Sequence, residues 1–514
     1  MYNSIKKYNQ IWLRNRCYSI VLILSLMLLS CKDTDDETTS VIEDLKISSF
    51  SFLAENNPSL NSDIHLTIED DKVTGRLGVS VAVSELVGTI EHNASAFLVN
   101  GIEQVNSESA NDFTDIVIYT LKSDDDREKT YEIDVTYFTG LPIFYIETDA
   151  GLPIDSTDDY REGSASIIGG RNYDDLEETD MKIRGRGHST WYFHPKKPYQ
   201  LKFSDETAIF DIPAEKKWIF LAEHSDKTLM RNKIAFEMGY LSVLDWTPNS
   251  TFSEVFINNS YNGTYHITQK VEAGSSRVDI GETGYLLEID NIDHIEEDDV
   301  IFYTGDFLIN IKEPELVVDS NEYNFIKDYI NEFENVLNSS QFDDPNIGYP
   351  KYIDIDTFID WYLISEITKN QDSKSYSSIY LNVIPGEKIK MGPLWDFDLA
   401  FGNVDYSECE YPEGFWVKDH DWYARLFQDE AFVNKVKLRF LFFKQNQGFI
   451  LNKIDNYAAY LKFAQQENNA KWNVIGNYVW PNPVVYNSYG EEVEHLKNWY
   501  TTRMNWLETA INNL

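Results

Sequence analysis

The sequence predicts an α+β protein in which a small N-terminal β-sandwich precedes a larger mixed domain with a helical C-terminal region. Short segments that alternate apolar and polar residues dominate from residue 43 to 140. Predicted strands and helices then alternate from residue 141 to about 400, and the last segment shows helical periodicity. With 514 residues, of which 42% are hydrophobic, the chain is long enough for two or three domains with cores of their own.

Residues 1–30 are predicted to be a targeting segment. Four basic residues precede an apolar run, Tyr18 to Leu29, that is too short to span a bilayer. The run ends in L-L-S-C, which resembles a bacterial lipobox, so Cys31 would be lipidated after cleavage. The alternative is an uncleaved signal anchor.

Residues 31–42 are predicted to form a polar tether between this lipid and the folded chain. The acidic run from Lys32 to Glu37 resembles the export signal of surface lipoproteins of the Bacteroides group. That resemblance implies a cell-envelope protein, anchored in the outer membrane through Cys31 and exposed at the cell surface.

Charge and cysteine usage exclude two classes of protein. The formal net charge of −41 argues against a nucleic-acid partner, because binding phosphates requires a basic surface. The three cysteines are Cys17, Cys31 and Cys409, so cleavage would leave one free thiol and no intrachain disulfide scaffold.

Residues 43–140 are predicted to form the sandwich. The runs Ile116–Leu121 and Tyr131–Tyr137 flank a polar turn and predict a hairpin. The region resembles the Ig-like N-terminal modules of Bacteroidota surface lipoproteins, which implies a spacer or contact role. Leu141–Pro142 marks the boundary to a second domain, 141–514, with a core at about 143–445 and a helical extension at about 446–514.

A glycine-bearing loop follows the strand that starts at Met181. Gly185 and Gly187 would let backbone amides approach an anion, and the Ser189 hydroxyl adds a donor. In the returning strand Lys202 lies on the face opposite Leu201, from which it could reach whatever the loop holds. An ordinary glycine hairpin is the alternative.

Carboxylates and amides follow at three further places. A strand and a helix after Lys216 carry Glu237, together with Arg231 and Asn232, for which a structural role in bonding loop carbonyls is favoured. A helix over 356–372 delivers Asp372 at its end, and a hairpin would return the chain to G-P-L-W-D-F-D-L-A-F-G at residues 392–402.

Asp396 and Asp398 are the two acids of this glycine-flanked apolar run. Burying ionised carboxylates costs several kcal/mol unless a cation or hydrogen bonds compensate. In an extended chain residues i and i+2 share a face, so both acids could point at one ion. Alternatively, one shapes a turn at Gly402 and the other faces water.

Together these segments resemble the spore-coat protein H (CotH) kinase family over about residues 143–445. The motifs that carry the resemblance are R-G-H-S-T-W with P-K-K-P-Y-Q-L-K-F, L-M-R-N-K-I-A-F-E, T-K-N-Q-D, and G-P-L-W-D-F-D-L-A-F-G. The resemblance implies an atypical protein-kinase-like domain with two lobes that transfers the γ-phosphoryl of ATP, with Mg²⁺, to Ser/Thr hydroxyls of a protein substrate.

The resemblance also implies a role for each candidate residue. Asp372 would be the catalytic base, and Asp396 and Asp398 the magnesium ligands. The loop would cover the nucleotide phosphates through Gly185, Gly187 and Ser189. Lys202 and Arg184 would contact these phosphates, and Glu237 would pair with Lys202.

Some features depart from ordinary kinases and leave alternatives open. Ser377 stands where ordinary kinases carry a metal-binding Asn, and no H-R precedes Asp372. The sequence lacks the zincin, serine-hydrolase and P-loop signatures, whereas a sugar-nucleotide glycosyltransferase or a glycosidase with paired acids stays possible. The alternative from another class is a non-catalytic surface lipoprotein that uses the kinase-like fold for adhesion or scaffolding.

Overall fold

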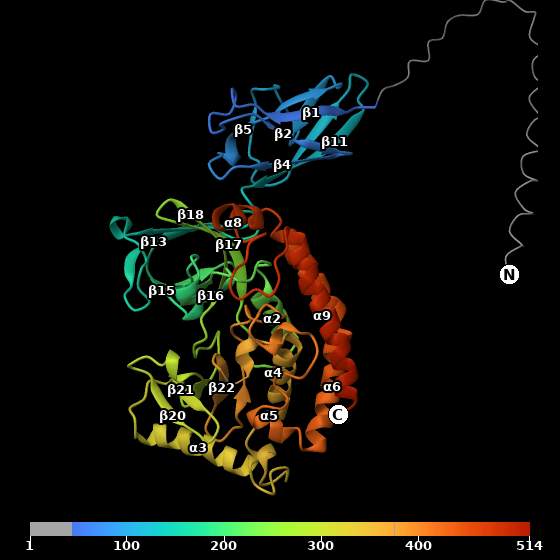
Figure 1. Ribbon diagram of the computed structural model, residues 1–514. Coiled ribbons are helices and arrows are strands. Elements are labelled where there is room, and N and C mark those ends of the chain that lie inside the picture. Colours follow the sequence, from blue (N-terminus) through green and yellow to red (C-terminus); the bar gives the residue numbers. More distant parts are fainter. Residues whose placement is uncertain (1–43, 375) are drawn as a thin grey trace, which may run out of the picture.

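The computed structural model describes residues 44–374 and 376–514. The predicted targeting segment and the whole predicted tether, including Cys31, lie outside the described residues. Figure 1 shows an N-terminal β module, a β-barrel below it, and then a mixed region, with long helices along one side. The predicted α+β class is confirmed.

The N-terminal module consists of two main sheets and a short strand pair, as expected for a β-sandwich. The sheets have the orders β2-β1-β6 and β3-β4-β11-β10-β7-β8, and β5 pairs with β9. The predicted hairpin is present as β10 and β11, in which Val117 faces Ile133. The strands are β1 (Ile47–Phe52), β2 (Ile64–His65), β3 (Thr67–Glu69), β4 (Lys72–Leu77), β5 (Leu86–Val87), β6 (Thr89–His92), β7 (Ala96–Val99), β8 (Ile102–Glu103), β9 (Ala110–Asn111), β10 (Val117–Lys122) and β11 (Glu128–Tyr137).

The second domain begins with a closed barrel that the sequence did not predict. Its order is β12-β13-β14-β15-β16-β18-β17, and a parallel pairing of β12 with β17 closes it. Apolar side chains such as Ile183, Leu201 and Trp218 fill the interior. The strands are β12 (Ile143–Thr148), β13 (Arg161–Ile168), β14 (Leu176–Gly185), β15 (Tyr199–Ile209), β16 (Ile212–Leu221), β17 (Ser250–Ile257) and β18 (Ser260–Gln269).

The turn between β17 and β18 lies at Asn258 and Asn259, not at the later glycine, Gly263. Both asparagines have positive φ, 48° and 60°, which suits a tight hairpin turn. Gly263 instead lies inside β18, where a Cβ would come within 2.7 Å of the Asn468 and Trp472 side chains. This glycine therefore permits the close approach of a C-terminal helix.

A five-stranded sheet and helices α2, α3 and α4 form the mixed region below the barrel. The sheet has the order β20-β21-β19-β22-β23, and the predicted hairpin between Asp372 and Asp396 is its β22–β23 pair. The elements are α2 (Arg231–Tyr240), β19 (Tyr285–Ile289), β20 (Val300–Tyr303), β21 (Leu308–Glu313), α3 (Asn321–Leu337), α4 (Ile355–Thr368), β22 (Ile379–Val383) and β23 (Lys390–Met391).

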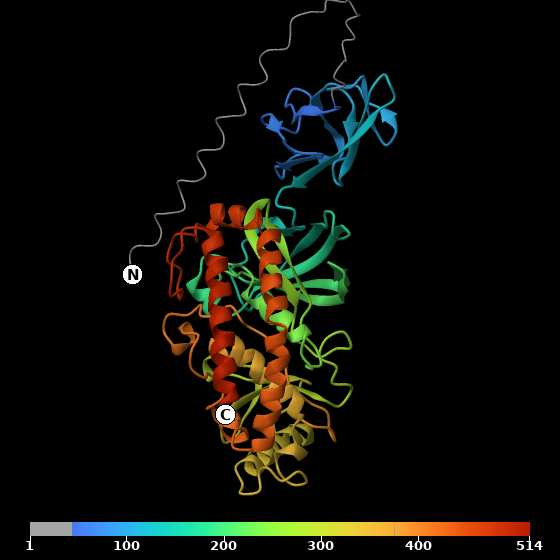
Figure 2. The ribbon, with the colours of Figure 1, turned by 90° about the vertical axis from the view of Figure 1, so that its right-hand side faces the viewer.

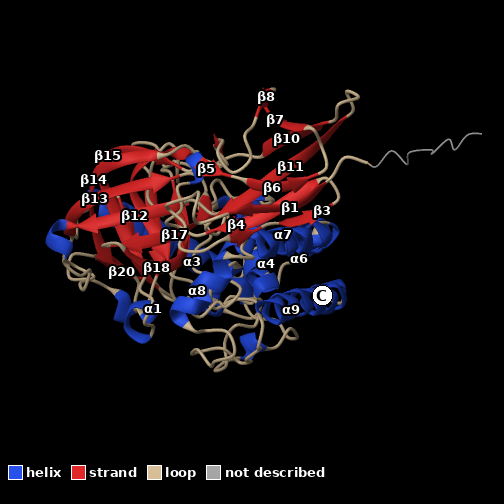
Figure 3. Ribbon diagram, turned by 90° about the horizontal axis from the view of Figure 1, so that it is seen from above, coloured by secondary structure: helices blue, strands red, loops and turns tan. Residues whose placement is uncertain are grey.

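The C-terminal helices are α5 (Asp421–Leu426), α6 (Glu430–Gln445), α7 (Gln447–Tyr460), α8 (Ala464–Trp472) and α9 (Tyr489–Asn512). Helix α9 runs alongside α6 and α7 (Figure 2). The apolar residues that give this segment its predicted helical periodicity are buried: Val493, Leu496, Tyr500, Met504, Leu507 and Ile511. Figure 3 shows these long helices on the side of the molecule away from strands β13 to β15. No helix in the described ranges is long and apolar enough to cross a membrane.

Two arginines join the N-terminal module to the second domain. Arg76 of β4 pairs with Glu467 of α8 at 2.7 Å, and its guanidinium lies 4.8 Å from the Phe463 ring centroid. Arg171, after β13, pairs with Asp134 of β11 at 2.6 Å. The module is therefore held both to the barrel and to the C-terminal helices.

Candidate functional site

Two segments far apart in the sequence pair through their backbones to form the floor of the site. The Phe401 N–H donates to the Thr368 carbonyl at 2.7 Å, and the Gln371 N–H donates to the Leu399 carbonyl at 3.2 Å. Helix α4 ends at Thr368, since the next residue, Lys369, has a left-handed φ of 45°. The chain therefore leaves the helix four residues before Asp372, earlier than the predicted end at residue 372.

Asn370 fixes the Asp372 turn against the segment that carries Asp396. Its Nδ2 donates to the Asp396 carbonyl at 3.0 Å, and its Oδ1 accepts from the Asp372 N–H at 3.3 Å. The Trp416 indole N–H donates to the Asn370 carbonyl at 2.8 Å. These bonds bring Asp372 and Asp396 to one place, although 24 positions separate them in the sequence.

Asp372, Asp396 and Asp398 form one electrostatic cluster. Burial raises the pKa of Asp372 to about 8, the charge of Asp396 adds to this effect, and His294 opposes it. Burial also raises the pKa of Asp398 well above its usual range, and repulsion by Asp396 and Asp372 and a hydrogen bond with the Asp396 carboxyl group raise it further. The surrounding protein groups therefore do not offset the repulsion among the three carboxylates when all are ionised.

The backbone that joins the two acids is not extended. Asp396 has a φ of 63°, and the stretch from Gly392 to Ala400 contains no strand. The expectation that an extended i, i+2 pair places them on one face was therefore wrong. A left-handed residue, followed by the Phe397 anchor described next, brings the carboxyl groups together.

Glu223 and Asn232 hold the residue between the two acids. The Phe397 N–H donates to Asn232 Oδ1 at 2.6 Å, and Asn232 Nδ2 donates to Glu223 Oε1 at 3.1 Å. Asn232 was expected to bond loop carbonyls, but it accepts from a backbone N–H. Glu223 Oε2 is buried without a hydrogen-bond partner among the described residues. Burial, followed by the charges of Asp226 and Asp398, raises the pKa of Glu223 well above its usual range.

Arg231 has the structural role that the sequence suggested. Its Nε donates to the Ala400 carbonyl at 3.2 Å, and its guanidinium pairs with buried Asp226. Asp226 also accepts from the Thr228 and Arg231 N–H groups, at 2.9 and 2.7 Å, and so organises the start of α2. This arrangement ties α2 to the segment that carries Asp398.

The glycine-bearing loop lies beside the acidic cluster. Gly185 ends β14, where a Cβ would lie 2.4 Å from the Trp191 ring, and Gly187 has a φ of 74°. Ser189 begins the short helix α1 (Ser189–Phe193). The guanidinium of Arg186 lies 5.6 Å from the ring centroid of Trp395, which precedes Asp396. The loop thus contacts the segment that carries two of the acids.

Lys202 lies on the outer face of the barrel, opposite the side of Leu201. It is the middle member of a row of three lysines, because Lys182 of β14 and Lys217 of β16 are its cross-strand neighbours. Lys217 pairs with Glu272 at 2.5 Å. In the part of the chain that the structure describes, no hydrogen bond or ion pair involves the Lys202 side chain.

Arg184, also on β14, is engaged by protein groups. Its guanidinium bonds the Thr157 carbonyl and lies 5.2 Å from the Tyr160 ring centroid. Its Nε is buried with no hydrogen-bond partner among the described residues. Arg184 is therefore only partly satisfied by the protein.

Glu237 does not pair with Lys202. Its carboxylate lies 3.2 Å from Lys453 Nζ of α7 and accepts a hydrogen bond from Tyr457. The predicted ion pair was wrong because Glu237 occupies the face of α2 that packs on α7, whereas Lys202 points away from the barrel. No pattern in the sequence indicated that a C-terminal helix would supply the partner of Glu237.

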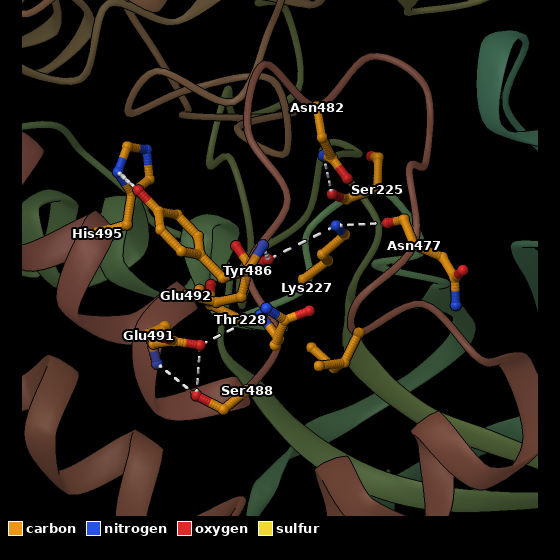
Figure 4. A network of polar contacts seen from close by, with 12 residues as sticks. Ser225, Lys227, Thr228, Asn477, Asn482, Tyr486, Ser488, Glu491, Glu492 and His495 are labelled. Atoms are coloured by element: carbon orange, nitrogen blue, oxygen red, sulfur yellow. Dashed lines mark hydrogen bonds and ion pairs between the residues drawn. The ribbon is translucent and has the colours of Figure 1, made fainter.

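The loop between α8 and α9, residues 473–487, contacts segments that flank the acidic cluster and is called the strap here. Asn482 Nδ2 donates to the Ser225 carbonyl at 2.7 Å and to Asn403 Oδ1 at 2.9 Å. Lys227 Nζ donates to the Asn477 carbonyl at 2.7 Å and lies 3.5 Å from Glu492 (Figure 4). The strap is therefore anchored to the segment that leads into α2.

The strap reaches Asp398 through one intermediate residue. Asn403 Nδ2 donates to the Asp398 carbonyl at 2.9 Å, and Ser225 Oγ lies 3.4 Å from Asp398 Oδ2. The Ser488 side chain accepts from the Glu491 N–H at 3.3 Å and caps α9 where the strap ends (Figure 4). Asn482 thus supports Asp398 from a position 84 residues away in the sequence.

Comparison with known families agrees with this layout. The family described as CotH kinase protein matches residues 183–507, more than half of the chain. The chain belongs to the CotH kinase family. The matched region starts in β14, before the glycine-bearing loop, and ends in α9. The CotH region therefore includes the acidic cluster, α2, the strap and the C-terminal helices.

Comparisons with curated proteins and with solved structures do not extend this family assignment. No curated protein matches the chain. A crystal structure from Bacteroides thetaiotaomicron, described as that of a candidate glycoside hydrolase, is 10% identical, with a TM-score of 0.16. The match covers 57% of this chain and 89% of that chain, and the low TM-score gives it no weight for the CotH fold or its chemistry.

Proposed function

We propose that the protein is an ATP- and Mg²⁺-dependent CotH-type atypical kinase that transfers the γ-phosphoryl group to Ser/Thr hydroxyls of a protein substrate. The observation that carries the proposal is the convergence of Asp372, Asp396 and Asp398 beside the glycine-bearing loop. Membership of the CotH family supports the same chemistry. A phosphoryl transferase needs a metal ligand, a carboxylate for the attacking hydroxyl and a phosphate-binding loop, and the site has a candidate for each.

Magnesium fits the acidic cluster. Asp396 and Asp398 offer hard oxygen donors whose carboxyl groups share a hydrogen bond, and burial, followed by repulsion from Asp396 and Asp372, raises the pKa of Asp398. No group of three or more His, Cys, Asp and Glu side chains in the described ranges is arranged to hold a metal by itself. Two carboxylates with phosphate oxygens completing the shell are the usual magnesium arrangement in kinases. Held by Asp396 and Asp398, such an ion would spread the charge that develops on the transferred group.

Asp372 is the proposed base. Its pKa of about 8 reflects burial and the negative charge of Asp396. Compensation of the charge of Asp396 would lower the pKa of Asp372 and so favour its ionised carboxylate. In that state it accepts the proton of the attacking hydroxyl.

The nucleotide phosphates would lie between the loop and the outer face of the barrel. Gly185, Gly187 and Ser189 are proposed to cover them, and Lys202, which no protein group engages in the described ranges, is proposed to contact them. Arg184 adds a guanidinium that the protein satisfies only in part. Glu237 is left out of this set, because Lys453 and Tyr457 bind its carboxylate.

The proposed setting is the outer membrane, where a lipid on Cys31 would hold the chain at the cell surface. The N-terminal module would then act as a spacer between the tether and the CotH region. The other candidate function, a non-catalytic adhesion or scaffolding protein, is favoured by exposed aromatic side chains such as Tyr192 and Tyr478. An adhesion or scaffolding protein would not bind nucleotide, so one experiment on ATP separates this function from the kinase.

The test uses the chain from residue 32 onward with ATP and Mg²⁺. Mass spectrometry would follow phosphate on the protein itself and on a generic protein substrate. We expect phosphorylation by the parent and at least a hundredfold loss in Asp396→Ala and Asp372→Asn, because charge stabilisation and proton acceptance are both lost. Asp356→Asn, at an exposed pair with Lys435, is the control. An absence of both phosphate transfer and ATP binding by calorimetry would overturn the proposal.

A further inference from the structure

Three exposed aromatic rings lead from the acidic cluster to the surface. The Tyr406 and Trp480 rings are stacked, with centroids 5.9 Å apart and planes at 11°. The Trp480 ring then contacts Phe193 at 5.3 Å. The exposed fractions are 52% for Tyr406, 38% for Trp480 and 66% for Phe193, so these rings are open to solvent. We call these three residues the aromatic track.

The inner end of the aromatic track lies beside the turn that carries the proposed catalytic base. Ser407, which follows Tyr406, donates a hydrogen bond to the side chain of Gln371, and Gln371 precedes Asp372. Tyr406 follows the Asp398 segment by a few residues, whereas Phe193 ends the helix after the glycine-bearing loop. The aromatic track thus connects both walls of the candidate site.

The aromatic track is fixed by its surroundings. The strap holds Trp480 in place, because Asn482 bonds Ser225 and Asn403. The Tyr478 hydroxyl donates to Asp405 Oδ2 at 2.8 Å, which joins the strap to the residue before Tyr406. A rigid surface loses little conformational entropy when a ligand binds, so exposed rings held in this way suit a binding role.

We propose that the aromatic track binds the phosphate acceptor and selects polypeptide segments that carry an aromatic or proline residue a few positions from the reactive hydroxyl. This inference rests on the proposed kinase function. Stacked rings bind flat or apolar side chains. The centroids of neighbouring rings in the aromatic track are 5.3 to 5.9 Å apart. About two residues of extended polypeptide span that distance.

A polypeptide fits the aromatic track better than a sugar does. Sugar hydroxyls require several polar groups around a stacking ring, since each buried hydroxyl needs a partner. The amide of Asn482 is bonded to Ser225 and Asn403, and Asp405 is bonded to Tyr478. Asp405 and Asn482 Nδ2 are thus engaged within the protein, and Asn482 Oδ1, which has no partner among the described residues, is buried away from a ligand on the rings.

The test compares peptides with one central serine in a glycine–alanine background. A tryptophan or proline is placed at each position from four residues before to four residues after the serine, and the intact protein is assayed with ATP and Mg²⁺. We expect at least one position to lower KM about tenfold relative to the ring-free peptide. Trp480→Ala and Phe193→Ala should remove that preference while the Kd for ATP stays within twofold.

Tyr411→Ala is the matched control, since Tyr411 is 56% exposed and lies outside the aromatic track. It should keep the preference. Phosphorylation without any ring preference, or a preference that survives Trp480→Ala, would overturn the acceptor proposal and leave the kinase intact. If ATP does not bind, the kinase fails, and calorimetry of the same peptides still tests the aromatic track. Binding of an oligosaccharide that Trp480→Ala abolishes would overturn the polypeptide assignment.

Discussion

Arg503 of α9 and Glu366 of α4 form an ion pair of 2.6 Å in which both side chains are fully buried. Glu366 also accepts from the Trp416 and Val417 N–H groups, at 2.6 and 2.8 Å. Arg503 also donates to the carbonyls of Pro412 and Gly414, at 2.9 and 2.7 Å. This ion pair thus joins three segments: helix α9, helix α4, which precedes Asp372, and the loop after Asp398.

Replacing Arg503 by methionine should destabilise the protein by about 3–5 kcal/mol, because Glu366 would be left as a buried charge without its partner. Chemical denaturation monitored by circular dichroism measures the change. The double variant Arg503→Met with Glu366→Gln should recover part of the loss. A single variant as stable as the parent would contradict the role of the pair.

Asp398→Asn should raise the stability of the ligand-free protein and abolish magnesium-dependent activity. The native pKa of Asp398 lies well above its unfolded value, so its ionisation costs stability as pH rises above about 4. The variant removes this cost, and the gain in Tm should therefore be larger at pH 8 than at pH 5. Differential scanning calorimetry without divalent ions measures it. The exposed control Asp356→Asn should change Tm little at either pH.

Acidification should destabilise the protein through His194 and His224, whose rings lie 5.0 Å apart. Burial lowers the pKa of His194 to about 4 and that of His224 to about 3, and nearby positive charges contribute. Below pH 6.5 the unfolded chain binds protons that the native state does not, so stability falls from about pH 6.5 to 4. The slope is at most about 1.4 kcal/mol per pH unit for each histidine.

Urea denaturation at pH 7.5, 6 and 5 would measure this slope. His194→Phe should flatten it, whereas His65→Gln, at an exposed position of β2, should leave it unchanged. An equal slope in the parent and in His194→Phe would show that other groups cause the acid sensitivity.

Gly263→Ala should destabilise the contact between the barrel and α8. Its φ is 107°, and a Cβ there would meet Asn468 and Trp472 at 2.7 Å, so the added methyl group costs about 1–3 kcal/mol and displaces α8. Gly448→Ala is the matched control, because nothing lies within 4 Å of the place that its Cβ would take in α7 and alanine favours helices. Thermal melts should show opposite signs for the two variants.

The sequence predicted the local elements around the site better than their long-range partners. The alternation of apolar residues located the β10–β11 hairpin, and helical spacing located the buried stripe of α9. The D-x-D run, together with T-K-N-Q-D, pointed to acids that the structure places in one cluster. These signals are local, because each depends on periodicity or on residue types a few positions apart.

The missed features depend on contacts between distant segments. Closure of the barrel needs β12 to pair with β17, and no spacing in the sequence encodes that pairing. Glu223 follows an apolar strand, where the sequence pattern is that of a surface residue, but in the fold its Oε1 lies 3.1 Å from both Asn232 Nδ2 and His266 Nδ1. Glu237 was paired with the wrong lysine, because its true partner Lys453 lies in a helix more than two hundred residues later.

The parallel pairing of β12 with β17 limits the ways in which another protein chain can bind to the barrel. In most sheets the outermost strands leave unpaired N–H and C=O groups that can recruit a strand from another chain. The barrel closes on itself through this pairing, so its seven strands have no outermost member. A neighbouring molecule in a crowded setting therefore cannot extend the barrel sheet and must bind through side chains instead.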